Sequence, residues 1–320
     1  MDLSIIYVNW NSVQYLRESI ASVYRHTHSV TFEIIVVDNA STEPGVDSLK
    51  ETFPAITIVH SDTNLGFAGA NNLGFRHSIG DHVLFLNPDT ELIAPSIDVL
   101  LAHLRTLPDA GIIGCKLLNT DLSVQLSSIQ TYPTILNQAM DAEYLRLRWP
   151  ECRLWKIAPL FSESPVPVKV DVIPGACMLL RRAAFEKVKC FSEEYFMYAE
   201  DLDLNYKVKA AGFCNYYVGE TAIIHHGGRS SSRQMISHWA TIMKYRAMVR
   251  LFHKTRGRVY ALGYRVAMAV VAIVRLVLLA MAAPLGNILW DRQSLRFSLE
   301  KWRTVLRCAL GWPEIATQCK

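Results

Sequence analysis

The order of strands and helices along the first ninety residues limits the fold of this chain more than any other feature. Short apolar runs at residues 3–8, 32–37, 56–60 and 82–86 predict buried strands. A helix is expected over residues 15–23, where apolar side chains recur every three or four positions. Strands that alternate with helices and are apolar on both faces are typical of α/β proteins. The sequence therefore predicts a mostly parallel central sheet flanked by helices.

Polar side chains follow three of these strands. Asn9 and Trp10 follow the first, Asp38 the second, and the turn Asn87-Pro88-Asp89 the fourth. Ligands of open α/β sheets bind beyond the carboxyl ends of the strands, so a site is expected there. A carboxylate such as Asp38 can accept hydrogen bonds from a ribose hydroxyl or a base N–H, although an aspartate that caps a turn would look the same.

A segment rich in glycine and asparagine, residues 64–74, is expected to be a turn that leads into a helix. Gly66 would let backbone N–H groups approach a ligand closely, and a helix N-terminus favours anions. The segment lacks the Gly-Lys-Ser/Thr of a phosphate-binding loop and is not a GxGxxG fingerprint. A plain tight turn is the alternative, which would leave Asn64 and Asn71 unexplained.

Asp89 is a candidate ligand for a divalent cation. Mg²⁺ and Mn²⁺ prefer hard oxygen ligands, often one or two carboxylates together with phosphate oxygens of a substrate. A single aspartate needs a further ligand, and His225 is the best candidate, with the adjacent His226 left open. An ordinary surface or core imidazole is the alternative for both.

Three carboxylates fall within residues 200–203, next to an aromatic cluster that begins at Phe196. Acidic groups beside aromatic ones are costly to bury unless a proton, a cation or a substrate hydroxyl compensates them. A helix N-terminus would also explain them, because acidic residues favour the first turn. Asp201 is the first candidate for a general base and Glu200 the second. Asp203 is expected to be a structural partner of Arg181, Arg182 or Lys207.

The C-terminal third is basic and apolar. No Asp or Glu occurs between Thr221 and Trp290, whereas Lys and Arg recur throughout. This pattern favours an anionic membrane surface as partner over nucleic acid. The run at 266–283, broken only by Arg275, predicts a helix lying in the membrane plane, with a true span or a buried helix as alternatives. One face of the preceding helix is expected to carry Met235, Trp239, Ile242, Met243 and Val249.

Other features of the sequence place the chain in the cell. The seven cysteines show no CxxC spacing and predict reduced thiols of a cytosolic protein. No signal peptide is expected at the N-terminus.

Residues 146–169 are rich in proline and tryptophan and predict an irregular excursion or lid, after which a strand is expected over 170–180.

Taken in order, six motifs resemble family 2 glycosyltransferases of the GT-A fold, which is Rossmann-like, and most of all the bacterial rhamnosyltransferases. The resemblance covers about residues 3–255. The motifs are Ser4–Asn11, Val36–Thr42, Asn64–Asn72, Phe85–Thr90, Phe196–Asp203 and Ile224–Gly228.

The resemblance implies an inverting transfer from a nucleotide-diphospho-sugar, with a divalent cation (Mn²⁺ or Mg²⁺) on the diphosphate. It implies that Asp201 is the base, with Glu200 as substitute, and that Asp89 and His225 hold the metal. Binding of the nucleotide-sugar is expected from eight residues: Val8, Asn9, Trp10, Asp38, Asn64, Gly66, Asn71 and Asn87.

Two departures from the family pattern stand out. The metal motif usually reads Asp-x-Asp, and here Asn87 takes its first position. The segment before the acidic cluster usually reads Gly-Gly-Phe-Asp-Glu, whereas this chain has Lys189-Cys190-Phe191-Ser192-Glu193. The second departure concerns the loop conformation and the choice of acceptor.

The leading functional hypothesis is a membrane-associated sugar transferase that moves L-rhamnose from dTDP-rhamnose to a lipid-linked or glycan acceptor of a cell-surface polysaccharide, at the cytoplasmic face. Galactofuranosyl or other UDP-hexose transfer, a non-catalytic glycan- or nucleotide-binding module, and a nucleotidyltransferase are the alternatives. The expected domains are a catalytic domain at 1–228, with a nucleotide-binding half (1–115) and an acceptor half (116–228), and a membrane-associating extension at 229–320.

Overall fold

The structure, a computed structural model, describes residues 1–162, 165–227, 236–282 and 292–312. As far as they are described, these residues form two compact units. The first comprises residues 1–132, 142–196 and 200–230, and the second comprises residues 133–141, 197–199 and 231–320.

The strands are β1 (Leu3–Asn9), β2 (Phe32–Asn39), β3 (Thr57–Ser61), β4 (His82–Leu86), β5 (Thr90–Leu92), β6 (Ala110–Leu118), β7 (Val168–Val170), β8 (Cys177–Arg181) and β9 (Cys214–His225). The helices of the first unit are α1 (Val13–His26), α2 (Leu49–Thr52), α3 (Gly66–Arg76), α4 (Ser96–Thr106), α6 (Glu143–Arg148), η1 (Ala158–Phe161), α7 (Arg182–Lys187) and α8 (Glu200–Ala210). Those of the second unit are α5 (Ile135–Ala139), α9 (Ile236–Ala282) and α11 (Arg292–Leu310).

All strands of the described residues join one mixed sheet in the order β3-β2-β1-β4-β8-β6-β9-β5, with β7 also paired to β9. The predicted parallel order is confirmed for β1 to β4. β6 and β9 are parallel to each other, whereas β5, β7 and β8 run antiparallel to their neighbours. The fold is α/β, as the sequence predicts.

The single strand expected over residues 170–180 is wrong. The chain leaves β7 at Val170 and re-enters the sheet at Cys177. Between them Pro174 has no N–H to give to a ladder, and the N–H of Gly175 donates to the side chain of Asp201 instead of to a neighbouring strand. Residues 146–169 are likewise not wholly irregular, since they hold the end of α6, η1 and the start of β7.

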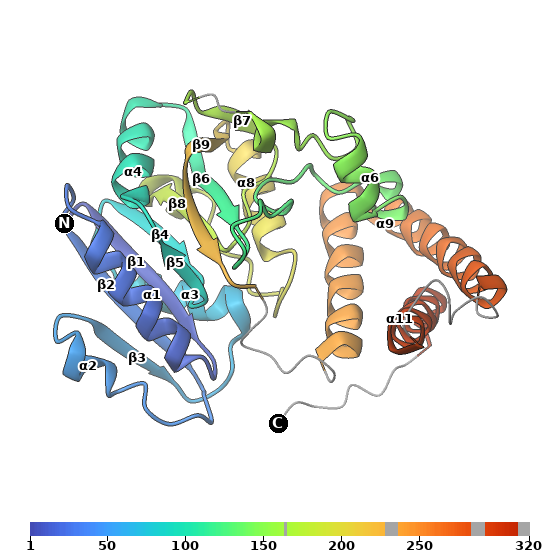
Figure 1. The fold of residues 1–320 in the computed structure, drawn as a ribbon, viewed down its shortest axis with the longest axis horizontal. Coiled ribbons are helices and arrows are strands. Elements are labelled where there is room, and N and C mark those ends of the chain that lie inside the picture. The colour runs from blue at the N-terminus through green and yellow to red at the C-terminus, as the bar shows by residue number, and fades with distance from the viewer. Residues whose placement is uncertain (163–164, 228–235, 283–291, 313–320) are drawn as a thin grey trace. The chain divides into compact units, whose positions relative to one another are not determined.

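The core of the first unit lies on both faces of the sheet (Figure 1). Along β1 the side chains of Leu3, Ile5 and Tyr7 join the cluster packed by α1 and α4, while Ile6 joins the cluster packed by α3, α7 and α8. This alternation is the period of two that a strand imposes. Helices on both faces hold the strand ends in fixed positions, which is the requirement for a preorganised site at the sheet edge.

The second unit is helical. Its α9 is bent at Gly257, which has non-helical backbone angles (φ 85°, ψ 173°), and both segments pack on α11 through Tyr245, Phe252, Tyr264, Met268, Ala272, Val305 and Ala309. Met235, expected on the first face of this helix, and Ala283, expected at the end of the apolar run, lie outside the described residues. Among the described residues, α9 is the helix long and apolar enough to cross a membrane, and 11% of its most apolar window is buried.

Candidate functional site

The carboxyl ends of β1, β2, β4 and β9 lie at one edge of the sheet, where β8 begins. This edge therefore gathers the polar residues that the sequence places after strands. Asn9 and His225 end their strands, Asp38 is the last residue but one of β2, and Asn87 directly follows β4.

Asp38 is buried and held by its neighbour on β1. The side-chain amide of Asn9 donates to Oδ1 of Asp38 at 3.0 Å and to Oγ of Ser41 at 3.1 Å, while its carbonyl oxygen accepts from Ser12. The Oδ2 atom of Asp38 lies 3.5 Å from Nδ1 of His60. Asn9 is thus engaged within the protein, and its contacts orient the Asp38 carboxylate toward the edge.

The turn before α3 is fixed by asparagines. Asn39 donates to Oδ1 of Asn64 at 2.9 Å and accepts from the N–H of Leu65 at 2.8 Å. Oδ1 of Asn64 also accepts from the N–H of Gly66. Further along the helix the amide of Asn71 donates to the carbonyl of Phe67. These amides shape the turn, which explains why a segment without a phosphate-loop motif is so rich in asparagine.

Gly66 brings this turn against the residue that precedes the acidic cluster. Its φ is +70°, and a Cβ at this position would lie 2.1 Å from the carbonyl oxygen of Phe196. The same oxygen accepts a hydrogen bond from the N–H of Phe67 at 2.9 Å. Only glycine fits here, both for its backbone angles and for the close approach. The turn before α3 and the start of the acidic segment are therefore held together.

Asp201 is connected to the Asn87-Pro88-Asp89 turn through two consecutive residues. Its Oδ2 accepts from the N–H of Gly175 at 3.2 Å, and the carbonyl of Ala176 accepts from the N–H of Asn87 at 3.0 Å. Oδ1 of Asp201 accepts from the N–H of Leu202 at 2.8 Å. The segment that enters β8 thus holds the candidate base beside the candidate metal turn.

Glu200 and Asp201 are buried carboxyl groups with raised pKa values. Burial raises the pKa of Glu200, and the negative charge of Asp201 raises it further. Burial also raises the pKa of Asp201, although the N–H groups of Leu202 and Gly175 stabilise its charged form and oppose the rise. Among the described residues, Oε2 of Glu200 has no hydrogen-bond partner. A carboxylate whose pKa is raised toward neutrality is a stronger base than an exposed one.

Asp89 carries a negative charge at the same edge. Burial alone would raise its pKa, but the hydrogen bond and charge of His225 outweigh burial and hold the pKa of Asp89 below its ordinary value. Nε2 of His225 lies 3.4 Å from Oδ1 of Asp89 and 3.4 Å from Nδ2 of Asn87. The two candidate metal ligands are thus brought together.

Gln125 sets the tautomer of His225. The amide nitrogen of Gln125 donates to the backbone carbonyl of His225, so its Oε1 faces Nδ1 of the ring at 3.0 Å. An amide oxygen only accepts, so Nδ1 carries a proton, and Nε2, which lies beside Asp89, is the ring nitrogen that could ligate a metal ion. A lone pair beside a carboxylate suits a cation between them, and second partners such as Gln125 commonly orient ligating histidines.

Asp89 and His225 therefore fit a divalent cation as two protein ligands, with other positions left for substrate oxygens. No group of three or more His, Cys, Asp or Glu side chains that could hold a metal occurs in the part of the chain that the structure describes. The ring of the adjacent His226 faces elsewhere: its Nδ1 lies 3.0 Å from Oγ1 of Thr120 and its Nε2 3.4 Å from Glu91.

Asp203 has the structural role expected of it. It is fully buried, accepts from the hydroxyl of Ser192 at 2.5 Å and lies 3.8 Å from Nζ of Lys207. Of the three predicted partners, Lys207 is confirmed. The alternative predictions, contacts of Asp203 with Arg181 or Arg182, are wrong. The guanidinium group of Arg181 donates to the carbonyls of Leu104 and Leu107, and that of Arg182 to the carbonyl of Gly80.

The remaining candidates differ in exposure. Trp10 is 36% exposed at the sheet edge, Val8 is half-buried, and Asn71 is buried.

Two residues that contribute to the site were not predicted from the sequence, Gln125 and Asn72. The side-chain amide of Asn72 donates to the carbonyl of Phe191 and to the carboxylate of Glu193. Asn72 lies within the Gly- and Asn-rich motif, whereas nothing local in the sequence distinguishes Gln125.

Comparison with known proteins identifies the family. The model of the family "Glycosyl transferase family 2" matches residues 4–189. An N-acetylglucosaminyl-diphospho-decaprenol L-rhamnosyltransferase of Mycobacterium tuberculosis is 31% identical over 255 residues, which cover 74% of this chain and 80% of the relative. The rhamnosyltransferase WbbL of Escherichia coli is 26% identical over 197 residues, covering 58% of this chain and 72% of the relative.

Solved structures share the fold. The mannosyltransferase PcManGT of Pyrobaculum calidifontis, in complex with GDP-Man and Mn²⁺, has a TM-score of 0.58 at 18% identity and covers 97% of this chain and 86% of its own. GalNAc-T7, with UDP, GalNAc and Mn²⁺, has a TM-score of 0.56 at 13% identity, with coverages of 78% and 47%. The chain therefore belongs to glycosyl transferase family 2 and is a GT-A glycosyltransferase that takes its sugar from a nucleotide donor.

Proposed function

We propose that this chain transfers L-rhamnose from dTDP-rhamnose to a glycan carried on an isoprenoid diphosphate, with inversion at the anomeric carbon. The transferred sugar and the acceptor are those that the name of the mycobacterial relative indicates, at 31% identity over most of both chains. The nucleotide of the donor, dTDP, follows from the resemblance to bacterial rhamnosyltransferases. Asp38 and the turn at 64–66 bind the nucleoside side of the donor, together with Trp10, Asn71 and Asn87.

Asp201 acts as the general base in this proposal. Its carboxylate takes the proton of the acceptor hydroxyl while that oxygen attacks the anomeric carbon, and the bond from this carbon to the nucleoside diphosphate breaks. No enzyme nucleophile is needed, because a single displacement gives the inverted product. The raised pKa of Asp201 makes its carboxylate a stronger base than that of an exposed aspartate. Glu200, the adjacent buried carboxyl group, is the substitute base.

Asp89 and His225 would hold the divalent cation, Mn²⁺ or Mg²⁺. When bound, the cation supplies positive charge for the departing diphosphate. The pKa of Asp89 lies below its ordinary value, so its carboxylate is ionised at neutral pH. Gln125 orients the ring of His225 so that Nε2 faces the same place. Asp89 and His225 therefore present a carboxylate oxygen and an imidazole nitrogen at one place, the two kinds of ligand atom that the cation would take from them.

The observation that carries the proposal is the short connection between base and metal turn. Gly175 donates to Asp201, and the next residue, Ala176, accepts from Asn87. A base and a leaving-group cation must act on opposite sides of one reacting carbon, so such rigid coupling is what a displacement requires. Burying two carboxyl groups side by side costs free energy. A non-catalytic binding module would have no need for such a pair at this place, whereas a catalytic site uses it to raise the pKa of a base.

The test is a panel of nucleotide-sugars with a lipid-linked acceptor, run on the wild type, Asp201→Asn and Asp62→Asn. We expect dTDP-rhamnose to be the preferred donor over UDP-galactofuranose and other UDP-hexoses. Asp201→Asn should lower kcat by about 10²–10⁴-fold, the usual contribution of a general base, while leaving donor binding intact. Asp62 is exposed, so its variant is the control for loss of one charge.

Undiminished transfer by Asp201→Asn would contradict the base assignment. EDTA should abolish transfer, and Mn²⁺ or Mg²⁺ should restore it; turnover that survives EDTA would contradict the metal role of Asp89 and His225. A different preferred donor would contradict rhamnose as the transferred sugar and would not contradict glycosyl transfer as the reaction.

We place the reaction at the cytoplasmic face of the membrane, where nucleotide-sugars are made.

A further inference from the structure

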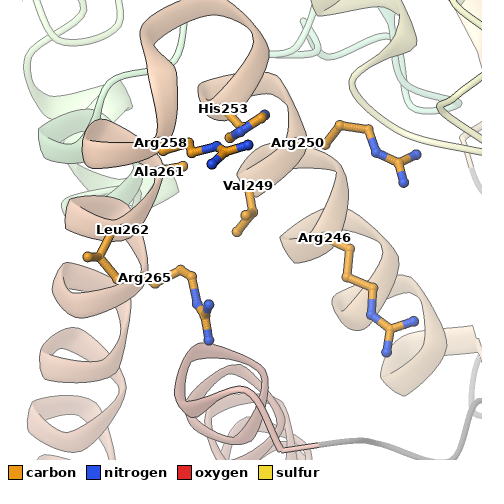
Figure 2. Close-up of a pocket in the computed structure, with 8 residues that line it drawn as sticks. All are labelled: Arg246, Val249, Arg250, His253, Arg258, Ala261, Leu262 and Arg265. Atoms are coloured by element: carbon orange, nitrogen blue, oxygen red, sulfur yellow. The ribbon is translucent and has the colours of Figure 1, made fainter.

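A cationic pocket lies within the second unit, in the bend of α9. It has a volume of about 440 Å³ and is lined by Arg246, Val249, Arg250, His253, Arg258, Ala261, Leu262 and Arg265. Figure 2 shows the side chains of Arg258 and Arg265 on the segment after the bend, and those of Arg246, Arg250 and His253 on the segment before it. Gly257 makes this arrangement possible, because its left-handed φ of 85° turns the two segments toward each other.

No carboxylate of the described residues is paired with Arg246, Arg250 or Arg258, and all three are exposed. Arg265 is oriented by the backbone, donating from Nε and Nη2 to the carbonyl of Ala309. The sequence supplies no acidic residue from Thr221 to Trp290 that could neutralise the cluster. Four like charges around one cavity repel each other unless an anion binds, so the pocket is built for a multivalent anion.

Arginine indicates which anion. Its planar guanidinium group donates two parallel hydrogen bonds to phosphate oxygens, which makes it the preferred residue for phosphate recognition. Four guanidinium groups exceed what one phosphate needs, and the cavity volume leaves room for a second. Two linked phosphates match both the charge and the size of the pocket.

An exposed apolar stripe begins at the wall of the same pocket. Leu262 lines the pocket and is 58% exposed, and Val266, Val270, Ile273, Val277 and Met281 continue from it at spacings of three and four residues, each at least half exposed. The opposite side of this segment, which includes Ala261, Tyr264, Met268 and Ala272, packs inside the unit. A contiguous apolar surface of this kind is rarely left in water and is typical of contact with lipid.

We propose that the pocket binds the diphosphate head group of an isoprenoid lipid, with the apolar stripe lying against the membrane that holds the lipid tail. The arginines contact the phosphate oxygens, and Val249, Ala261 and Leu262 contact the first carbons of the tail. The inference rests on the proposed function in naming an isoprenoid as the carrier; the pocket and its charge stand without it. It gives the second unit a role in selecting the acceptor.

The test measures binding to vesicles in the absence of donor. Three preparations are compared: phosphatidylcholine alone, phosphatidylcholine with phosphatidylglycerol, and phosphatidylcholine with a polyprenyl diphosphate, the last two matched in surface charge. The variants are Arg250→Gln/Arg258→Gln in the pocket and Arg303→Gln/Arg307→Gln on α11, exposed arginines of the same unit that do not line the pocket.

The wild type should bind the diphosphate vesicles at least tenfold more tightly than the charge-matched phosphatidylglycerol vesicles. The pocket variant should lose this preference, so that its affinities for the two anionic vesicles become equal, because the removed guanidinium groups are among those that contact the phosphates in the proposal. The α11 variant should keep the preference. Equal binding to both anionic vesicles, or equal loss of preference in both variants, would overturn the inference.

This test fails separately from the proposed function. Asp201→Asn should bind the diphosphate vesicles like the wild type, since its defect lies in the first unit. Conversely, a wild type that transfers sugar but shows no diphosphate preference would retain the proposed function and reject the pocket. Circular dichroism of both double variants excludes unfolding as the cause.

Discussion

Glu200 and Asp201 are adjacent carboxyl groups that folding removes from water. Burial is the main cause of the raised pKa of each, and the charge of Asp201 adds to it for Glu200. Ionisation of both groups in the folded protein therefore lowers the free energy of unfolding. Such a cost is common where a site needs a base of raised pKa.

The sign of the effect follows from proton linkage. A carboxyl group whose pKa is higher in the folded than in the unfolded state binds more protons when folded, so the free energy of unfolding falls as the pH rises from the ordinary pKa of Glu to the raised pKa of Glu200. Glu200→Gln removes this titration. Relative to the wild type, the variant should gain about 1–3 kcal/mol between pH 5 and pH 8, at about 1.4 kcal/mol for each unit of pKa shift.

Urea unfolding of the wild type and the variant at the two pH values measures the difference. Glu18→Gln is the matched control, because Glu18 is exposed on α1 and its charge is not buried by folding. Its effect on unfolding should be the same at both pH values. If the stability difference for Glu200→Gln is also independent of pH, then Glu200 is not held in the folded state with a raised pKa.

At the scale of elements, the segment between α7 and α8 is where this chain departs from its family. Lys189 and Cys190 stand where the family usually has two glycines, and both have left-handed backbone angles, with φ of 60° and 58°. Three contacts hold the segment in place: Asn72 to Phe191, Ser192 to Asp203, and Lys207 to the carbonyl of Cys190. The glycine conformation is thus retained without glycine, at a cost of about 1–2 kcal/mol per residue.

Lys189→Gly should therefore stabilise the protein. The side chain of Lys189 is exposed, so the substitution relieves the left-handed strain, and part of the gain is offset by the larger entropy of glycine in the unfolded chain. The expected net effect is an increase of about 0.5–1 kcal/mol in the free energy of unfolding.

The matched control is Ala183→Gly, only six positions away. Ala183 is exposed and helical, in α7, so glycine there should destabilise by about 1 kcal/mol. Opposite signs for the two substitutions, measured by chemical unfolding, would establish the left-handed turn. The same sign for both would mean that residue 189 has ordinary backbone angles.

The elements that the sequence predicts well are those fixed by local pattern. β1, β2 and β4 are apolar runs ended by polar residues, and α8 ends before Gly212, which has the expected positive φ of 92°. The direction of β8 could not be predicted, because it depends on pairing with β4 and β6, far away in sequence. The break before β8 was missed because the carboxylate that takes the N–H of Gly175 belongs to another element.

The same distinction holds for the site. Asp38, Asp89 and Asp201 could be predicted, since each follows a strand or opens a helix in a family motif. Gln125 could not, because its role comes from contact with His225, one hundred residues further along the chain. Local signals identify the candidate site residues, whereas the groups that orient them appear only in the folded chain.

For the whole molecule, charge and apolar surface are divided between the two units. The candidate base and metal ligands belong to the first unit, and the acid-free stretch from Thr221 to Trp290 lies largely in the second. The exposed apolar side chains of α9 after Gly257 are the surface that the proposed membrane contact uses. Arg275 near the middle of the run has its guanidinium group over the ring of Trp302, so this charge is accommodated within the unit.

We expect the protein to lie on the membrane by this apolar surface, and its release should separate apolar from electrostatic binding. At about 1 M salt the Debye length falls to about 3 Å, which screens the arginines, so the fraction that stays bound measures the apolar contribution. The wild type should remain largely bound in high salt and be released by alkaline carbonate.

The double variant Val266→Lys/Val277→Lys should be released by salt alone, because both side chains are exposed on the stripe. Ile79→Lys, on an exposed residue of the first unit, is the control and should behave like the wild type. Retention of the wild type after carbonate would instead indicate a helix that crosses the membrane, since only an integral protein resists that wash.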